Sequence, residues 1–117
     1  MDRIERTEAT MQELFHQPAV TTEGTDPEFM RILQRFIFGD VCHTGSLDNR
    51  IRELLTVVLL AALGGAEVQV KSHVEGALKA GNSKEELVCA LVHAGCYMGI
   101  PRLFNALNTC KELLTHE

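Results

Sequence analysis

The stretch LLTVVLLAAL, residues 54 to 63, decides the fold that this sequence predicts. Asp48 can cap a helix that begins at Asn49, and Gly64-Gly65 ends that helix. A helix needs about 20 apolar residues to cross a bilayer, so a run of this length indicates a buried core helix instead. Because its last turns are apolar on every side, we expect it to be the central helix of a bundle.

The rest of the chain is also helical in its periodicity, with Pro or Gly at the joints. Asp26 and Pro27 open one helix, and Ser83 with Glu86 forms a capping box that opens another. No segment alternates with a period of two, so we predict an all-α fold of about six antiparallel helices. We expect these helices at residues 3–16, 27 to about 41, 49–63, 66–81, 84 to about 98 and 101–114. The division that we expect is an N-terminal helix and linker, 1–25, and a helical domain, 26–117.

Composition narrows the class of protein. The chain has 117 residues, of which 45% are hydrophobic, which is typical of one packed globule. A net charge of −5 without any cluster of Lys and Arg argues against nucleic acid and anionic membranes as partners. The N-terminal stretch is charged and unlike a signal peptide, so we expect free thiols in a reducing cytoplasm. Five other short helices offer limited cover for residues 54–63, and we therefore expect subunits to share the core.

Glu53 lies one turn before the apolar run, on a face that continues into the buried part of the helix. One interpretation is an ion pair with Arg50 or Arg52 at the edge of the bundle. The other is a general acid or base whose pKa is tuned by partial burial.

His73 shares a helical stripe with Val70, Val74 and Ala77. An imidazole in that place is either a hydrogen-bonded core residue or a group that moves protons at neutral pH. Glu53 and His73 lie on successive helices that can pack antiparallel, but their distances from the turn differ. The sequence therefore leaves open whether the two side chains meet within one chain.

Two groups of thiols and imidazoles allow other chemistry. Cys89, His93 and Cys96 share one face, with spacing that suits either a metal ligand pair or small core residues. Three ligands on one helix do not close a tetrahedral site, so we predict no metal centre. Cys42-His43, in the turn before residue 49, is either an activated thiol or an inert one.

Taken together, these segments resemble the carboxymuconolactone decarboxylase family, within the alkylhydroperoxidase D-like superfamily. The similarity runs in order over about residues 36–115. The matching pieces are Phe38-Gly39-Asp40-Val41, Leu47-Asp48, Arg52-Glu53-Leu54, Ala62-Leu63-Gly64, His73, Gly76-Ala77-Leu78, Gly81, Glu85-Glu86, Tyr97, Gly99, Pro101 and Asn105-Ala106-Leu107.

The resemblance implies an all-helical protein that assembles as a homotrimer or homohexamer, with sites near subunit interfaces. It implies a decarboxylase of aromatic catabolism that converts a carboxylated muconolactone to an enol-lactone without a cofactor. It also implies, as the alternative, a peroxide-reducing enzyme with a CxxC pair. The two thiols of that pair would fall at Ala66 and Gln69, so the dithiol cycle is absent. In such enzymes a Glu before the pair and a His just after it assist the thiols, and these two residues are kept here as Glu53 and His73.

The sequence departs from the family pattern at Cys42, His93 and Cys96. Our first hypothesis is a lyase acting on a small acidic lactone, with Glu53 and His73 catalytic and Arg50, Arg52 and Tyr97 binding the substrate. The second is a thiol-dependent redox protein that uses Cys42 or Cys96. The third is a non-catalytic, oligomeric binding protein.

Overall fold

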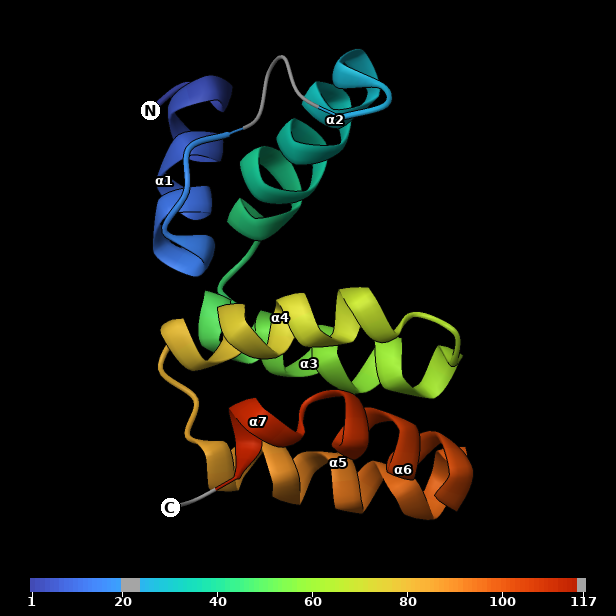
Figure 1. Cartoon of the computed structure of the whole chain (residues 1–117). Helices are drawn as coiled ribbons and strands as arrows, with labels where there is room; N and C mark the ends of the chain where they lie inside the picture. The colour runs from blue at the N-terminus through green and yellow to red at the C-terminus, as the bar shows by residue number, and fades with distance from the viewer. Residues whose placement is uncertain (20–23, 116–117) are drawn as a thin grey trace. The chain divides into compact units, whose positions relative to one another are not determined.

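The computed structural model describes residues 1–19 and 24–115, and within these ranges the chain is helical and has no strand, as predicted. None of the described helices is long and apolar enough to cross a membrane. The chain divides into two compact units, Met1–Asp48 and Asn49–Glu117. The helices, shown in Figure 1, are α1 (Arg3–Phe15), α2 (Pro27–Gln34), α3 (Asn49–Leu63), α4 (Glu67–Lys79), α5 (Lys84–Met98), α6 (Ile100–Thr109) and α7 (Lys111–Leu114).

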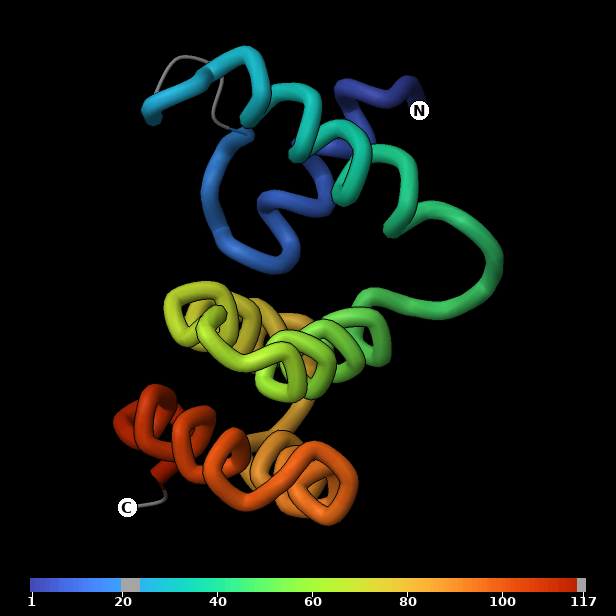
Figure 2. The backbone as a smooth tube through the Cα atoms, turned by 90° about the vertical axis from the view of Figure 1, so that its right-hand side faces the viewer, coloured from blue at the N-terminus to red at the C-terminus, as the bar shows by residue number. Residues whose placement is uncertain are grey.

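The second unit is built from α3 to α7, and its helices α3, α4, α5 and α6 run in alternating directions (Figure 1). Viewed along their axes, α3 and α4 form one pair, and α5 and α6 form another (Figure 2). The side chains between the two pairs are buried and apolar, and burial of a valine or leucine side chain there stabilises the fold by about 1.5–3 kcal/mol. The most completely buried ones are Val57, Val74, Ala77, Leu87, Leu91 and Cys110.

The ends of α3 and α5 lie where the sequence predicts them. Ser83 and Glu86 form the predicted capping box at the start of α5, with the Ser83 hydroxyl accepting a hydrogen bond from the Glu86 amide at 3.0 Å. Gly64, directly after α3, has a φ of +74°, a conformation that glycine adopts without strain. The sequence signals at these two ends are local, which is why they predict the boundaries well.

Helix α3 is not covered on all sides by the other helices of its own unit. Its buried residues, Glu53, Val57 and Ala61, form a single stripe. Leu55, Leu59 and Leu63 lie on another face and are 48%, 62% and 70% exposed. Part of the apolar surface of α3 is therefore exposed, and the expectation that subunits share the core stays a prediction.

The last predicted helix is divided into two helices in the structure. Instead of one helix over 101–114, the chain forms α6 and α7 with a break at Cys110, whose φ of −103° and ψ of 15° are not helical. Cys110 and Leu114 are both buried, so the change of direction keeps both side chains in the core.

In the first unit, the helix expected over residues 27 to about 41 changes geometry twice. After α2 the chain continues as a π-helical segment, η1 (Arg35–Asp40), and a 3₁₀ turn, η2 (Val41–His43). Gly39, in η1, lies against α1 so closely that a Cβ atom would come within 2.4 Å of the Thr7 hydroxyl.

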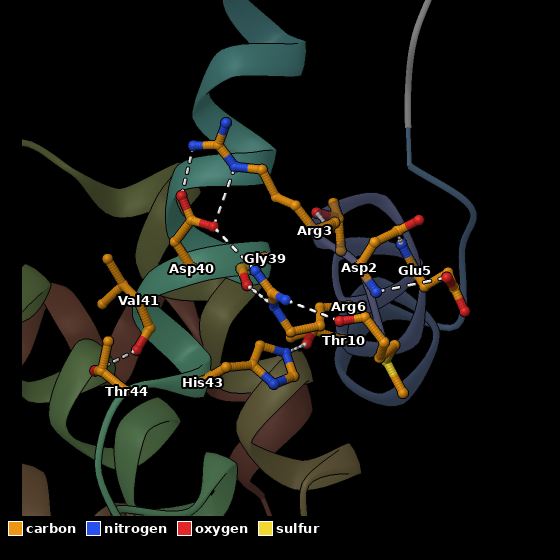
Figure 3. A network of polar contacts seen from close by, with 12 residues as sticks. Asp2, Arg3, Glu5, Arg6, Thr10, Gly39, Asp40, Val41, His43 and Thr44 are labelled. Carbon is orange, nitrogen blue, oxygen red and sulfur yellow. Dashed lines mark hydrogen bonds and ion pairs between the residues drawn. The ribbon is translucent and has the colours of Figure 1, made fainter.

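Polar contacts join η1 and η2 to α1 (Figure 3). Asp40 forms an ion pair with Arg3, and Arg6 Nε donates to the Gly39 carbonyl at 2.7 Å. The hydrogen bond from Arg3 holds the pKa of Asp40 below its ordinary value. A carboxyl whose pKa is lowered in the folded protein stops contributing to stability only when the pH falls through that pKa. The ion pair between Asp40 and Arg3 is therefore kept at neutral pH.

Candidate functional site

The structure brings Glu53 and His73 into direct contact within one chain. Glu53 is in the second turn of α3 and His73 is in the middle of α4. His73 Nδ1 lies 2.8 Å from Glu53 Oε2. The Glu53 side chain is 4% exposed, whereas the His73 side chain is 21% exposed. The carboxylate is therefore enclosed, while the imidazole is partly accessible.

The chemistry of the two groups determines which of them donates the hydrogen bond. An ionised carboxylate only accepts hydrogen bonds, so His73 donates from Nδ1. Nε2 is the other ring nitrogen, and its protonation decides the charge of the ring. When Nε2 is protonated, the buried carboxylate balances the charge of the imidazolium. Carboxylate–histidine pairs in general fix the tautomer and the orientation of the ring in this way.

Arg50, predicted as a substrate ligand, is engaged by the protein. Its Nη1 donates to Asn82 Oδ1 at 3.1 Å and to Glu86 Oε2 at 3.0 Å. These bonds link the first turn of α3 to the start of α5. The hydrogen bonds with Ser83, and after them the guanidinium of Arg50, hold the pKa of Glu86 below its ordinary value. The guanidinium of Arg50 thus has a structural role one turn away from Glu53.

The other two predicted substrate ligands occupy different places. Arg52 directly precedes Glu53 and is partly buried. Tyr97 is 83% exposed, and its ring lies 5.6 Å from that of His93. Arg50 at the start of α3 contacts Glu86 at the start of α5, and the two helices run in the same direction (Figure 1). Tyr97 lies roughly 16 Å beyond Glu86 along α5, at about 1.5 Å per residue, whereas Glu53 lies only about 4.5 Å beyond Arg50 along α3. Within one chain, the structure does not bring Tyr97 to the Glu53–His73 pair.

A small cavity lies at the other end of α3. It is about 10 Å³ in volume, which is roughly the space of one water molecule. Its lining includes Gly64, Ala66, Val70 and Arg102, but neither Glu53 nor His73. Ala66 is one of the two positions at which the resemblance would place a thiol in a hydroperoxidase.

Similarity to known proteins assigns the chain to a family. The sequence pattern of the Carboxymuconolactone decarboxylase family matches residues 27–112, which include every helix from α2 to α6. The chain belongs to this family. A curated relative, the 4-carboxymuconolactone decarboxylase of Acinetobacter baylyi, is 26% identical over 108 residues, which cover 92% of this chain and 80% of the relative.

The four cysteines of this member of the carboxymuconolactone decarboxylase family form no disulfide and differ in burial. Cys42 is partly buried in the first unit, next to His43, whose Nε2 lies 2.9 Å from the Thr10 hydroxyl. Cys89 and Cys96 are exposed on α5, so they are not core residues, and Cys110 is buried. Across residues 1–19 and 24–115, no three side chains of His, Cys, Asp or Glu are placed to hold a metal ion.

These differences predict a clear order of thiol reactivity. Burial raises the pKa of the Cys110 thiol, so little of it is thiolate at neutral pH. We expect iodoacetamide at pH 7.5 to modify Cys89 and Cys96 in the folded protein and to leave Cys110 unmodified until the protein is denatured, as measured by peptide mass spectrometry. Modification of Cys110 at the rate of Cys89 would contradict the buried position. A much faster reaction at Cys42 or Cys96 than at a model thiol would favour the redox hypothesis.

One residue near the pair was not predicted from the sequence. Asn82 is 4% exposed, and its side chain bonds to both α3 and α4. Its only sequence signal is its place between Gly81, which ends α4, and Ser83, which caps α5. That position is ordinarily typical of an exposed turn residue.

Proposed function

We propose that this chain is a decarboxylase that acts without a cofactor on a small carboxylated lactone of the 4-carboxymuconolactone type. The observation that carries the proposal is the buried Glu53 carboxylate bonded to the partly exposed ring of His73. The two residues lie inside the region that matches the family. The name of the Acinetobacter relative supports this substrate class.

The reaction requires an electron sink and a proton donor. The bond between carbon and the carboxylate breaks, carbon dioxide leaves, and the electron pair moves into the conjugated lactone carbonyl. The resulting enolate takes one proton at carbon, so each turnover consumes one proton. We assign His73 Nε2 as the donor and Glu53 as the group that orients the ring and balances its charge. Solvent then returns the proton to His73.

We assign the substrate carboxylate to Arg52. Arg52 has an interaction of its own within the protein, which the substrate carboxylate would join or replace. Arg52 neighbours Glu53 in sequence, and a guanidinium binds a carboxylate with two parallel hydrogen bonds.

Arg52→Ala should raise the KM at least tenfold, because a charge-assisted hydrogen bond contributes about 1.5–3 kcal/mol. Arg52→Lys should recover part of that loss, since it restores the charge but not the paired geometry. Steady-state kinetics of carbon dioxide release measures both variants. An unchanged KM in Arg52→Ala would remove this assignment.

We further propose that the enzyme works as a homotrimer or homohexamer. The exposed leucine face of α3 is a surface of the kind that another subunit covers. Assembly would also exclude water from the accessible edge of His73, which strengthens the electrostatic effect of Glu53.

The direct test is incubation of the purified protein with 4-carboxymuconolactone. We expect one carbon dioxide per molecule of substrate consumed, measured by a coupled bicarbonate assay, with the lactone product identified by mass spectrometry. Carbon dioxide release no faster than in buffer, for this and related carboxylated lactones, would contradict the proposed function.

A further inference from the structure

The structure points to a third residue behind the catalytic pair. We propose that Asn82 is a positioning residue that fixes α3 against α4 at the register where Glu53 meets His73. The inference rests on the proposed function for its catalytic meaning, but the geometry that it predicts can be measured separately.

The side-chain amide of Asn82 forms hydrogen bonds to both α3 and α4, through its two N–H donors and its acceptor oxygen. Nδ2 donates to the carbonyl of Arg50 at 2.9 Å and to the carbonyl of Ala77 at 3.1 Å. Oδ1 accepts from Arg50 Nη1 at 3.1 Å. The backbone amide of Asn82 also donates to Ala77, at 3.0 Å. One buried amide therefore joins the first turn of α3 to the last turn of α4.

This clamp lies one helical turn from the pair on both helices. Arg50 precedes Glu53 by three residues, and Ala77 follows His73 by four, which correspond to about 4.5 Å and 6 Å along the axes. Hydrogen bonds of this type span only about 2.7–3.2 Å. A slide of α3 along α4 by about 2 Å would therefore stretch the bonds of Asn82 to Arg50 and the 2.8 Å contact between His73 and Glu53 beyond this range together.

Only an asparagine provides this set of bonds at this position. Aspartate has the same shape but no donor, so a carboxylate oxygen would face the two carbonyls of Arg50 and Ala77. Alanine would leave those carbonyls without the cross-helix donor and the guanidinium of Arg50 without one of its acceptors. Arg50 contributes to the clamp through one bond, and it is held from the other side by Glu86.

The test compares Asn82→Ala with Asn108→Ala, the same substitution at an exposed asparagine on α6. Proton NMR of ¹⁵N-labelled protein reports the His73 Nδ1 proton, which is assigned by its absence in His73→Gln. We expect the wild type and Asn108→Ala to share a downfield Nδ1 signal, and Asn82→Ala to lose it or move it upfield. We also expect kcat of Asn82→Ala, corrected for the folded fraction, to fall at least tenfold with KM within about twofold.

A purely structural asparagine would lower the melting temperature and leave the His73 signal of the folded protein unchanged, and that result would overturn the proposal. Asn82→Ser, which keeps one donor, should retain a weakened signal. If both variants fail to fold, Asn82 holds the whole unit together, and the specific role proposed here is wrong. If the wild type has no decarboxylase activity but Asn82→Ala loses the Nδ1 signal, the positioning role stands and the proposed function fails.

Discussion

Replacing His73 by glutamine is expected to lower kcat for decarboxylation by about 10²–10⁴-fold, the usual contribution of a general acid. Glutamine keeps a polar amide near Glu53 Oε2, but it has no proton to give to carbon at neutral pH. The substrate carboxylate is held elsewhere in our account, so KM should change little. Initial rates of carbon dioxide release over a range of substrate concentrations measure both quantities.

The matched control is His93→Gln, which changes an exposed histidine on α5. This variant should keep the activity of the wild type, and circular dichroism should show that both variants are folded. If His73→Gln retained full activity, the assignment of His73 as the proton donor would be wrong, whatever the role of Glu53.

Replacing Leu59 by lysine is expected to convert the assembly to single chains. Leu59 is 62% exposed, and it lies between Leu55 and Leu63 on the apolar face of α3. A charge at the centre of an apolar interface would be buried without a partner, which costs several kcal/mol for each copy. Light scattering coupled to size exclusion should give three or six times 13.0 kDa for the wild type and 13.0 kDa for Leu59→Lys.

Val68→Lys supplies the control, because Val68 is 78% exposed on α4 and lies outside the leucine face. It should assemble like the wild type. A wild-type protein that runs as a single chain would remove the proposal of a shared core. A Leu59→Lys protein that keeps the assembled mass would place the interface on another surface.

The sequence predicted the fold wherever the signals are local. The helices Asn49–Leu63 and Lys84–Met98 begin and end where caps and glycines indicate, because these groups act within one turn. The break at Cys110 and the π-helical segment at Arg35–Asp40 were not predicted. Both depend on packing, of Cys110 into the core and of Gly39 against Thr7, and periodicity carries no sign of either.

The candidate site was predictable in its residues and not in its geometry. Glu53 and His73 were singled out by their places on apolar faces and by the family resemblance. Their contact depends on the register of two helices, and that register is fixed by Asn82, which is distant in sequence from Glu53. Tyr97 was carried over with the family pattern, but it lies at the far end of α5 from the pair.

The central claim is that Glu53 and His73 act as one unit, and a double-mutant cycle tests it most directly. The measurement is kcat/KM for decarboxylation in the wild type, Glu53→Gln, His73→Gln and the double variant. Residues that work as a unit are strongly non-additive, so the double variant should be no more than about threefold slower than His73→Gln alone. If the losses of the two single variants multiply in the double variant, or if neither substitution slows the reaction, the pair is not the catalytic unit.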